Sequence, residues 1–237
     1  MAENASADSW AHALDDLVAL IDHPIPAPAH WIENGSREEL DEARAVAVAW
    51  GWLMRAKRTA QAVLGLDRLG FGTEAAPLLC SFVEHAARLV WAGRRERSEA
   101  VEILVGVHLD AGRGLSEDEL QLLGALQHDH LGKAVEPDGG SDLLRLFTRA
   151  QRESHPGTAS ASAYLEESAD RHGWLLRLLP KEREPALDAH LAALLLLAFE
   201  GYVRIAGLGG QFGPGIDALG ARMEHLVAVG GREPAAG

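Results

Sequence analysis

Helix start signals recur along this chain at intervals that suit a protein built of helices. Ser36-Arg37-Glu38-Glu39 and Ser116-Glu117-Asp118-Glu119 each place a serine three residues before a glutamate, which is the pattern of a capping box. Between such signals, apolar residues recur at helical spacing. No sustained alternation of apolar and polar residues predicts a strand. The sequence therefore predicts an all-α fold, a compact multi-helix bundle of about nine helices.

Short connectors rich in Pro, Gly and Ser are expected to separate these helices. The segment Gly207 to Gly215 is rich in glycine, but it follows a helix rather than a strand, so we expect a flexible helix connection and not a phosphate loop. Thr73 is the expected cap of the third helix. The predicted helices span residues 8–22, 36–64 with a short continuation, 73–93, 98–109, 116–128, 141–154, 160–179, 185–206 and 216–229.

The chain is expected to divide into three parts. Residues 1–35 form an N-terminal helical arm and a Pro-rich connector, because Pro24, Pro26 and Pro28 stop the first helix. Residues 36–229 form the helical bundle domain, and residues 230–237 form a flexible tail. The arm could pack on a second subunit, which makes a homodimer one expected assembly.

The charge of the chain argues against one class of partner. The formal net charge is −13, and the first fifty residues hold ten acidic and two basic side chains. Such a chain repels phosphate backbones, which disfavours non-specific nucleic-acid binding. The basic clusters at residues 55–58 and 94–97 are interpreted as solvated helix faces and as a helix C-terminus complementing its dipole.

The sequence predicts neither a secretory signal nor a membrane-spanning segment. The N-terminal residues lack the basic start and apolar core of a secretory signal. The longest apolar run, Leu191 to Phe199, has nine residues and is shorter than the ~20 of a membrane helix. We therefore expect a cytoplasmic protein that does not contact a membrane.

Neither a metal centre nor a cofactor is expected. The lone Cys80 excludes an intrachain disulfide and a Cys-rich zinc site. His128-Asp129-His130 has the residue types of a metal site, but residues two apart on a helix point away from each other, and no third ligand is set by spacing.

The expected helix from Thr73 to Gly93 places an ionisable pair, Glu84-His85, among apolar residues. A surface helix is apolar on one stripe only, so this helix is expected to be covered on both sides. A carboxylate there needs partners or is neutralised, which is how functional sites are often built. The alternative is an exposed pair of Glu84 with Arg88. One broad face holds Leu79, Phe82, Ala86, Leu89 and Val90, and the opposite face holds Cys80, Ala87 and Trp91.

A second candidate group lies at the end of the helix predicted to stop at Ser154. Arg149 and Arg152 could hold an anion there, while His155 could serve as an acid or base. A histidine at a helix C-terminus gains from the dipole when protonated. The alternative is that these are ordinary surface residues complementing that dipole. Tyr164, further along, could pair with a carboxylate in the same pocket, or could only pack.

Two stretches together resemble a widespread bacterial family of all-helical proteins of unknown function. Leu78 to Trp91, which contains Glu84, is similar to a helix of that family, and Ser154-His155-Pro156-Gly157 resembles its later Ser-x-x-His-Pro-Ser segment. The two stretches stand in the same order as in the family. The resemblance implies that Glu84 and His155 meet in space inside a helical bundle. It implies no reaction.

The spacing of Arg149 and His155 also resembles that of HEPN ribonucleases, which are helical and dimeric. Ala150 stands where that family usually has a polar residue. The resemblance implies that Arg149 steadies the scissile phosphate and that His155 assists proton transfer.

These observations lead to three hypotheses about function. The first is a soluble helical protein with a buried pocket that binds a small polar or aromatic ligand, in which a Glu/His couple suits proton transfer. Its pocket would be lined by Glu84, His85, Trp91, His155 and Tyr164. The second is a metal-independent, HEPN-like ribonuclease of toxin or defence type. The third is a non-catalytic protein that binds a partner through its acidic N-terminal part. Whether the protein is an enzyme is left open.

Overall fold

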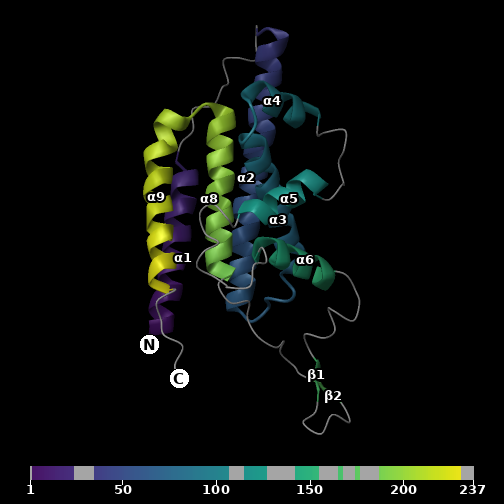
Figure 1. Ribbon diagram of the computed structural model, residues 1–237, viewed down its shortest axis with the longest axis vertical. Helices are drawn as coiled ribbons and strands as arrows, with labels where there is room; N and C mark the ends of the chain where they lie inside the picture. Colours follow the sequence, from purple (N-terminus) through teal and green to yellow (C-terminus); the bar gives the residue numbers. More distant parts are fainter. Residues whose placement is uncertain are drawn as a thin grey trace.

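The described chain is a bundle of helices (Figure 1). The computed structural model describes residues 2–23, 35–106, 115–126, 142–154, 165–167, 174–176 and 187–230. Eight helices lie in these ranges, which confirms the all-α prediction. They are α1 (Ala2–Ile21), α2 (Arg37–Arg68), α3 (Ala76–Gly93), α4 (Arg97–Gly106), α5 (Glu117–Leu126), α6 (Asp142–Ser154), α8 (Leu187–Ala206) and α9 (Gly209–Gly230).

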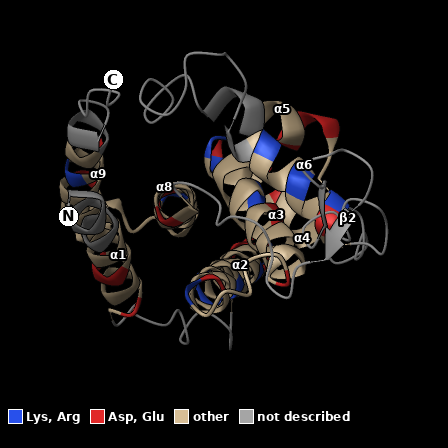
Figure 2. Ribbon diagram, turned by 90° about the horizontal axis from the view of Figure 1, so that it is seen from below, with Lys and Arg blue, Asp and Glu red and all other residues tan. Residues whose placement is uncertain are grey.

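Helix α8 is the centre of the bundle. It packs against α1 and α9 on one side and against α2, α3 and α4 on the other. Figure 2 shows the same order seen from below, with α1 beside α9, then α8, then α2 and α3, and α5 and α6 beyond α3. Thirteen of the residues of α8 are buried, because the neighbouring helices cover most of its circumference.

By length and composition alone, α8 could cross a membrane. The window of α8 that meets this test is 67% buried inside the bundle, as in the core helix of a folded domain. It is the one such helix in the described ranges. Its apolar composition is therefore accounted for by its neighbours α1, α2, α3 and α9.

Both predicted capping boxes are present. The Ser36 hydroxyl accepts a hydrogen bond from the Glu39 backbone at 3.3 Å, and the Glu39 carboxylate accepts one from the Ser36 backbone at 2.7 Å. Ser116 and Glu119 repeat this geometry at the start of α5, with the same two distances. Helix α2 continues without a break through Gly51 to Arg68.

The predicted cap at Thr73 is wrong. Helix α3 begins at Ala76, its N-cap residue is Ala75, and no side chain caps it. Residues 72–76 form tight turns instead, in which the Ala75 and Ala76 amides donate to the carbonyls of Gly72 and Thr73. Backbone carbonyls thus satisfy amides that a threonine hydroxyl was expected to satisfy.

The predicted flexible connection at Gly207 to Gly215 is wrong over most of its length. Only Gly207, with a φ of 69°, turns the chain, and α9 begins at Gly209 and continues through Pro214. Phe212 explains the difference, because its ring is buried and packs edge-on against Phe199 of α8, with ring centroids 5.4 Å apart. Burial of one aromatic side chain outweighs the low helix propensity of the surrounding glycines.

The predicted helix over residues 160–179 is wrong where the structure describes it. Leu165–Glu167 and Trp174–Leu176 are short strands, β1 and β2, that pair antiparallel with Leu165 opposite Leu176. They lie beyond the lower end of the bundle in Figure 1. Away from other helices, apolar residues at helical spacing have no face to bury, so local periodicity did not decide the structure here.

Helix α1 packs within its own chain, against α8 and α9. Of its predicted apolar face, Trp10, Leu14, Leu17 and Ile21 are buried and Val18 is half-buried, and Ala13 is buried as well. The connector at 24–34 lies outside the described residues. At the end of α1, the exposed Asp22 carboxylate forms an ion pair with Lys57 of α2, whose side chain is only 9% exposed. The interpretation of Lys57 as part of a solvated face is therefore wrong.

Candidate functional site

Helix α3 is covered on both sides, as its sequence predicted. It packs against α2 and α8 on one side and α6 on another, with α4 and α5 also in contact. All five residues of its broad apolar face are buried: Leu79, Phe82, Ala86, Leu89 and Val90. On the opposite face Ala87 is buried, whereas Cys80, Glu84 and Trp91 are half-buried. This second face, turned toward α5 and α6, carries the candidate site.

Glu84 is a half-buried carboxyl group with no hydrogen-bond donor in contact with it in the described chain. Burial raises the pKa of Glu84, the nearby Arg88 lowers it by a smaller amount, and the nearby Glu119 raises it further. Burial disfavours the charged carboxylate because the protein replaces water around it. Glu84 therefore holds a proton to higher pH than a free glutamate does.

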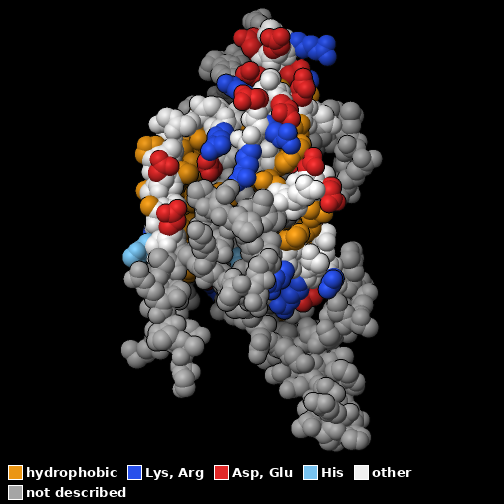
Figure 3. All heavy atoms as spheres, in the orientation of Figure 1, with side chains coloured by type: hydrophobic (Ala, Val, Ile, Leu, Met, Phe, Trp, Pro, Cys, Tyr) orange, Lys and Arg blue, Asp and Glu red, His pale blue; other side chains and the backbone are white. Residues whose placement is uncertain are grey.

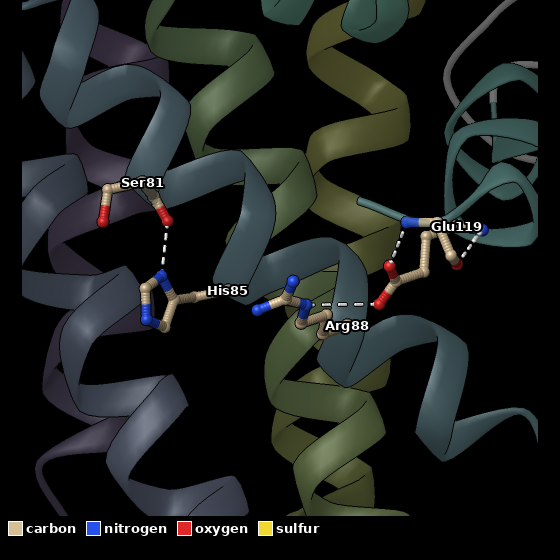
Figure 4. A network of polar contacts seen from close by, with 5 residues as sticks. Ser81, His85, Arg88 and Glu119 are labelled. Atoms are coloured by element: carbon tan, nitrogen blue, oxygen red, sulfur yellow. Dashed lines mark hydrogen bonds and ion pairs between the residues drawn. The ribbon is translucent and has the colours of Figure 1, made fainter. Parts of the chain in front are cut away.

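Arg88 forms an ion pair with a residue outside α3. Its Nε lies 3.3 Å from the Glu119 carboxylate, and the Glu119 side chain is only 9% exposed (Figure 4). Glu119 is also the capping-box glutamate of α5, so one carboxylate holds the start of α5 and ties it to α3. Sequence reasoning recognised the cap but not the ion pair.

The face also carries the contact between α3 and α6. Cys80 Sγ lies 3.5 Å from Ser154 Oγ, and the Ser154 hydroxyl donates to the Ala150 carbonyl. Burial raises the pKa of the Cys80 thiol, the Ser154 hydroxyl lowers it, and Glu84 raises it. Cys80 and Glu84 are one turn apart on α3, so the last residue of α6 lies beside the Glu84 face.

The two candidate arginines of α6, Arg149 and Arg152, are exposed. Arg149 donates from Nε to Glu153 at 2.9 Å, and its side chain is 52% exposed. His155 and Tyr164 lie outside the described residues, so the predicted meeting of Glu84 with His155 stays a prediction.

His85 lies one turn before Arg88 on α3, and Figure 4 shows its imidazole beside the preceding turn of that helix. Its Nδ1 donates to the Ser81 carbonyl at 2.6 Å, since a carbonyl can only accept. Burial lowers the pKa of His85, the Ser81 carbonyl raises it, and the charges of Arg55 and Arg88 lower it. Together these effects favour the neutral imidazole.

Trp91 lies two turns beyond Glu84 on the same face, with the Arg95 guanidinium 4.8 Å from its ring centroid. One surface of the indole is thus occupied by a cation. Among the described residues, no group of three or more His, Cys, Asp or Glu side chains is placed to hold a metal ion.

Comparison with known protein families, with characterised proteins and with solved structures finds no significant match. Any function has therefore to be argued from the residues of this chain.

Proposed function

We propose that this protein binds a small polar or aromatic molecule between α3, α5 and α6, and that Glu84 receives it and exchanges a proton with it. The observation that carries the proposal is the state of the Glu84 carboxyl group. It is half-buried, its pKa is raised, and no described side chain donates a hydrogen bond to it. A buried carboxyl group with free acceptor positions is suited to a ligand that donates.

The surroundings of Glu84 support a ligand that carries a donor group. Arg88 already forms an ion pair with Glu119, so its positive charge offsets the negative charge of the Glu84 carboxylate only in part. The contact between Cys80 and Ser154 closes one end of the face, and Trp91 provides an aromatic surface at the other. A cationic or N–H-bearing ring would place its donors at Glu84 and its plane toward Trp91.

Proton transfer is the chemistry that this carboxyl group could add to binding. A general acid or base works best when its pKa is near the working pH, and burial moves the pKa of Glu84 in that direction. If His155, which follows Ser154 in sequence, lies beside it, the two groups would form an acid–base couple. Cys80 is a poor nucleophile in this role, because its raised pKa leaves the thiol protonated.

Benzamidine and benzoate test the proposal, because the two probes share a ring and differ in the sign of their charge. In NMR titrations, benzamidine should shift the amide signals of Cys80, Glu84 and Ser154 in a saturable way, and benzoate should not. The Glu84→Gln variant should lose at least ~10-fold in benzamidine affinity, because a charge-assisted hydrogen bond is removed.

Glu102→Gln is the matched control, because Glu102 is an exposed glutamate of α4 with no ion pair in the described chain. It should bind benzamidine as the wild type does. Equal affinities of wild type and Glu84→Gln, or no saturable shift on this face, would contradict the proposal. Native mass spectrometry of the purified protein would then look for a retained small molecule that identifies the natural ligand.

The two other hypotheses stay predictions with their own tests. A HEPN-like ribonuclease would cleave cellular RNA as a purified protein and lose this activity in Arg149→Ala and His155→Ala variants. A partner-binding protein would use the acidic first fifty residues or Trp10 and Trp31; within that stretch, the acidic side chains at the start of α2 lie at the upper end of the molecule in Figure 3. Its complex should be lost when the residues before Ser36 are removed. A cytoplasmic location and a homodimer are likewise proposals.

A further inference from the structure

A second candidate site lies where α3 crosses α8, away from Glu84. A hollow of about 100 Å³ opens there. Gly93 and Gly201 lie in its wall, and they bring the two backbones together so closely that neither position has room for a Cβ. The absent side chains leave space beside the crossing, over Val90 and Leu197.

The polar groups around this hollow are two guanidinium groups and one carboxylate. Arg94 comes from the end of α3, and Glu200 and Arg204 come from α8. Arg204 donates to Glu200 one turn earlier. Arg94 is exposed and makes no ion pair in the described chain. The lining therefore carries a net positive charge on a protein whose formal net charge is −13.

Local positive charge on a strongly acidic chain concentrates small anions. Guanidinium groups present parallel N–H donors that match the oxygens of carboxylate and phosphate. Arg204 already holds one carboxylate, that of Glu200, through part of its donor set. The C-terminal carbonyls of α3 disfavour an anion, so the two arginines have to provide the attraction.

From these features we propose that the hollow between α3 and α8 binds a small oxyanion, held by Arg94 on one side and Arg204 on the other. The ligand class is inorganic phosphate or a short carboxylate, because their oxygens match the N–H donors of the two guanidinium groups. Glu200 competes with this ligand for Arg204 and repels it, so the site contains its own opposing charge. This binding is independent of the ligand proposed for the Glu84 face.

The test is an NMR titration with inorganic phosphate and, separately, with acetate, at constant ionic strength. The amide signals of Gly93, Arg94 and Gly201 should shift in a saturable way, and phosphate should bind more tightly than acetate because it carries more charge. Arg94→Ala should weaken phosphate binding at least ~10-fold, since it removes charge-assisted hydrogen bonds. Glu200→Gln should strengthen it several-fold by releasing Arg204.

Arg95→Ala is the matched control. Arg95 is the next residue along and has a similar charge, but it is bound to Glu99 and to the Trp91 ring and does not line the hollow. It should leave the phosphate affinity within about two-fold, the range expected for a screened charge. Absence of saturable shifts, or equal affinities in wild type and Arg94→Ala, would overturn the proposal. Arg94 and Arg95 are exposed and Glu200 is half-buried, so none of the three substitutions removes a core side chain.

Discussion

Gly93 of α3 and Gly201 of α8 meet where the two helices cross. A Cβ built on Gly93 would lie 2.8 Å from the carbonyl oxygen of Gly201, and one built on Gly201 would lie 2.9 Å from the carbonyl carbon of Leu89. These neighbours are backbone atoms, which cannot swing aside as a side chain can. The central helix is thus held to α3 by contact between the two main chains.

This contact predicts that Gly201→Ala destabilises the protein. The added methyl group has to push α8 away from α3, and overpacking of this kind costs about 1–3 kcal/mol. Gly51→Ala is the control, because Gly51 is an exposed glycine in the middle of α2 with open space around it. That change should stabilise the protein by up to about 1 kcal/mol through helix propensity. Urea denaturation measures both, and equal effects would refute the close crossing.

The two capping boxes predict different costs for the same substitution. Glu39→Ala removes one exposed cap of α2 and should cost about 0.5–1 kcal/mol. Glu119→Ala removes an equivalent cap of α5 and also the buried partner of Arg88, so about 2–4 kcal/mol is expected. Thermal and urea unfolding compare the two variants. A difference below about 0.5 kcal/mol would show that the ion pair adds nothing.

The raised pKa of Glu84 predicts a stability that falls as pH rises. Below the unfolded-state value of 4.5 both states are protonated, and the native state is at its most favourable. Between 4.5 and the raised native pKa the unfolded chain loses its proton first, so the free energy of unfolding decreases. Glu84→Gln should reduce this decrease. Unfolding followed from pH 4 to 8 checks it, with Glu102→Gln expected to keep the wild-type slope.

The lowered pKa of His85 predicts that the stability of the protein falls as pH falls. As pH falls below 6.5 the unfolded chain takes up a proton, while the buried native imidazole stays neutral until its lower pKa is reached. The free energy of unfolding therefore decreases with falling pH across that interval. His85→Gln should flatten the profile there, whereas His12→Gln, at an exposed site on α1, should leave it unchanged. A flat wild-type profile would contradict the assignment.

The contact of Cys80 with Ser154 predicts the reactivity of the thiol. Burial raises the pKa of Cys80, so alkylation by iodoacetamide should reach its half-maximal rate at a higher pH in the native protein than in the urea-unfolded one. Ser154→Ala removes a hydrogen bond that lowers this pKa and should move the native midpoint higher still. Ser98→Ala, at an exposed site on α4, serves as the control. Identical midpoints for the wild type and Ser154→Ala would show that the hydroxyl does not act on the thiol.

Local sequence determined most of the helices and the covered state of α3. Capping boxes at Ser36 and Ser116 act within one turn, so they could be recognised without knowledge of the fold. The mixture of apolar residues on both faces of α3 likewise required neighbours on both sides, and those neighbours are present. For Glu84, the sequence indicated an ionisable group in apolar surroundings, and its half-buried position and raised pKa follow from that.

Contacts between distant segments decided the rest. The pairing of Arg88 with Glu119, the contact of Cys80 with Ser154 and the burial of Lys57 beside Asp22 join residues on different helices, and no spacing along the chain encodes them. Burial of Phe212 made a helix of a glycine-rich segment. The meeting of Gly93 and Gly201 has the same origin, because the room available to a side chain is set by the neighbouring helix and not by the residue itself.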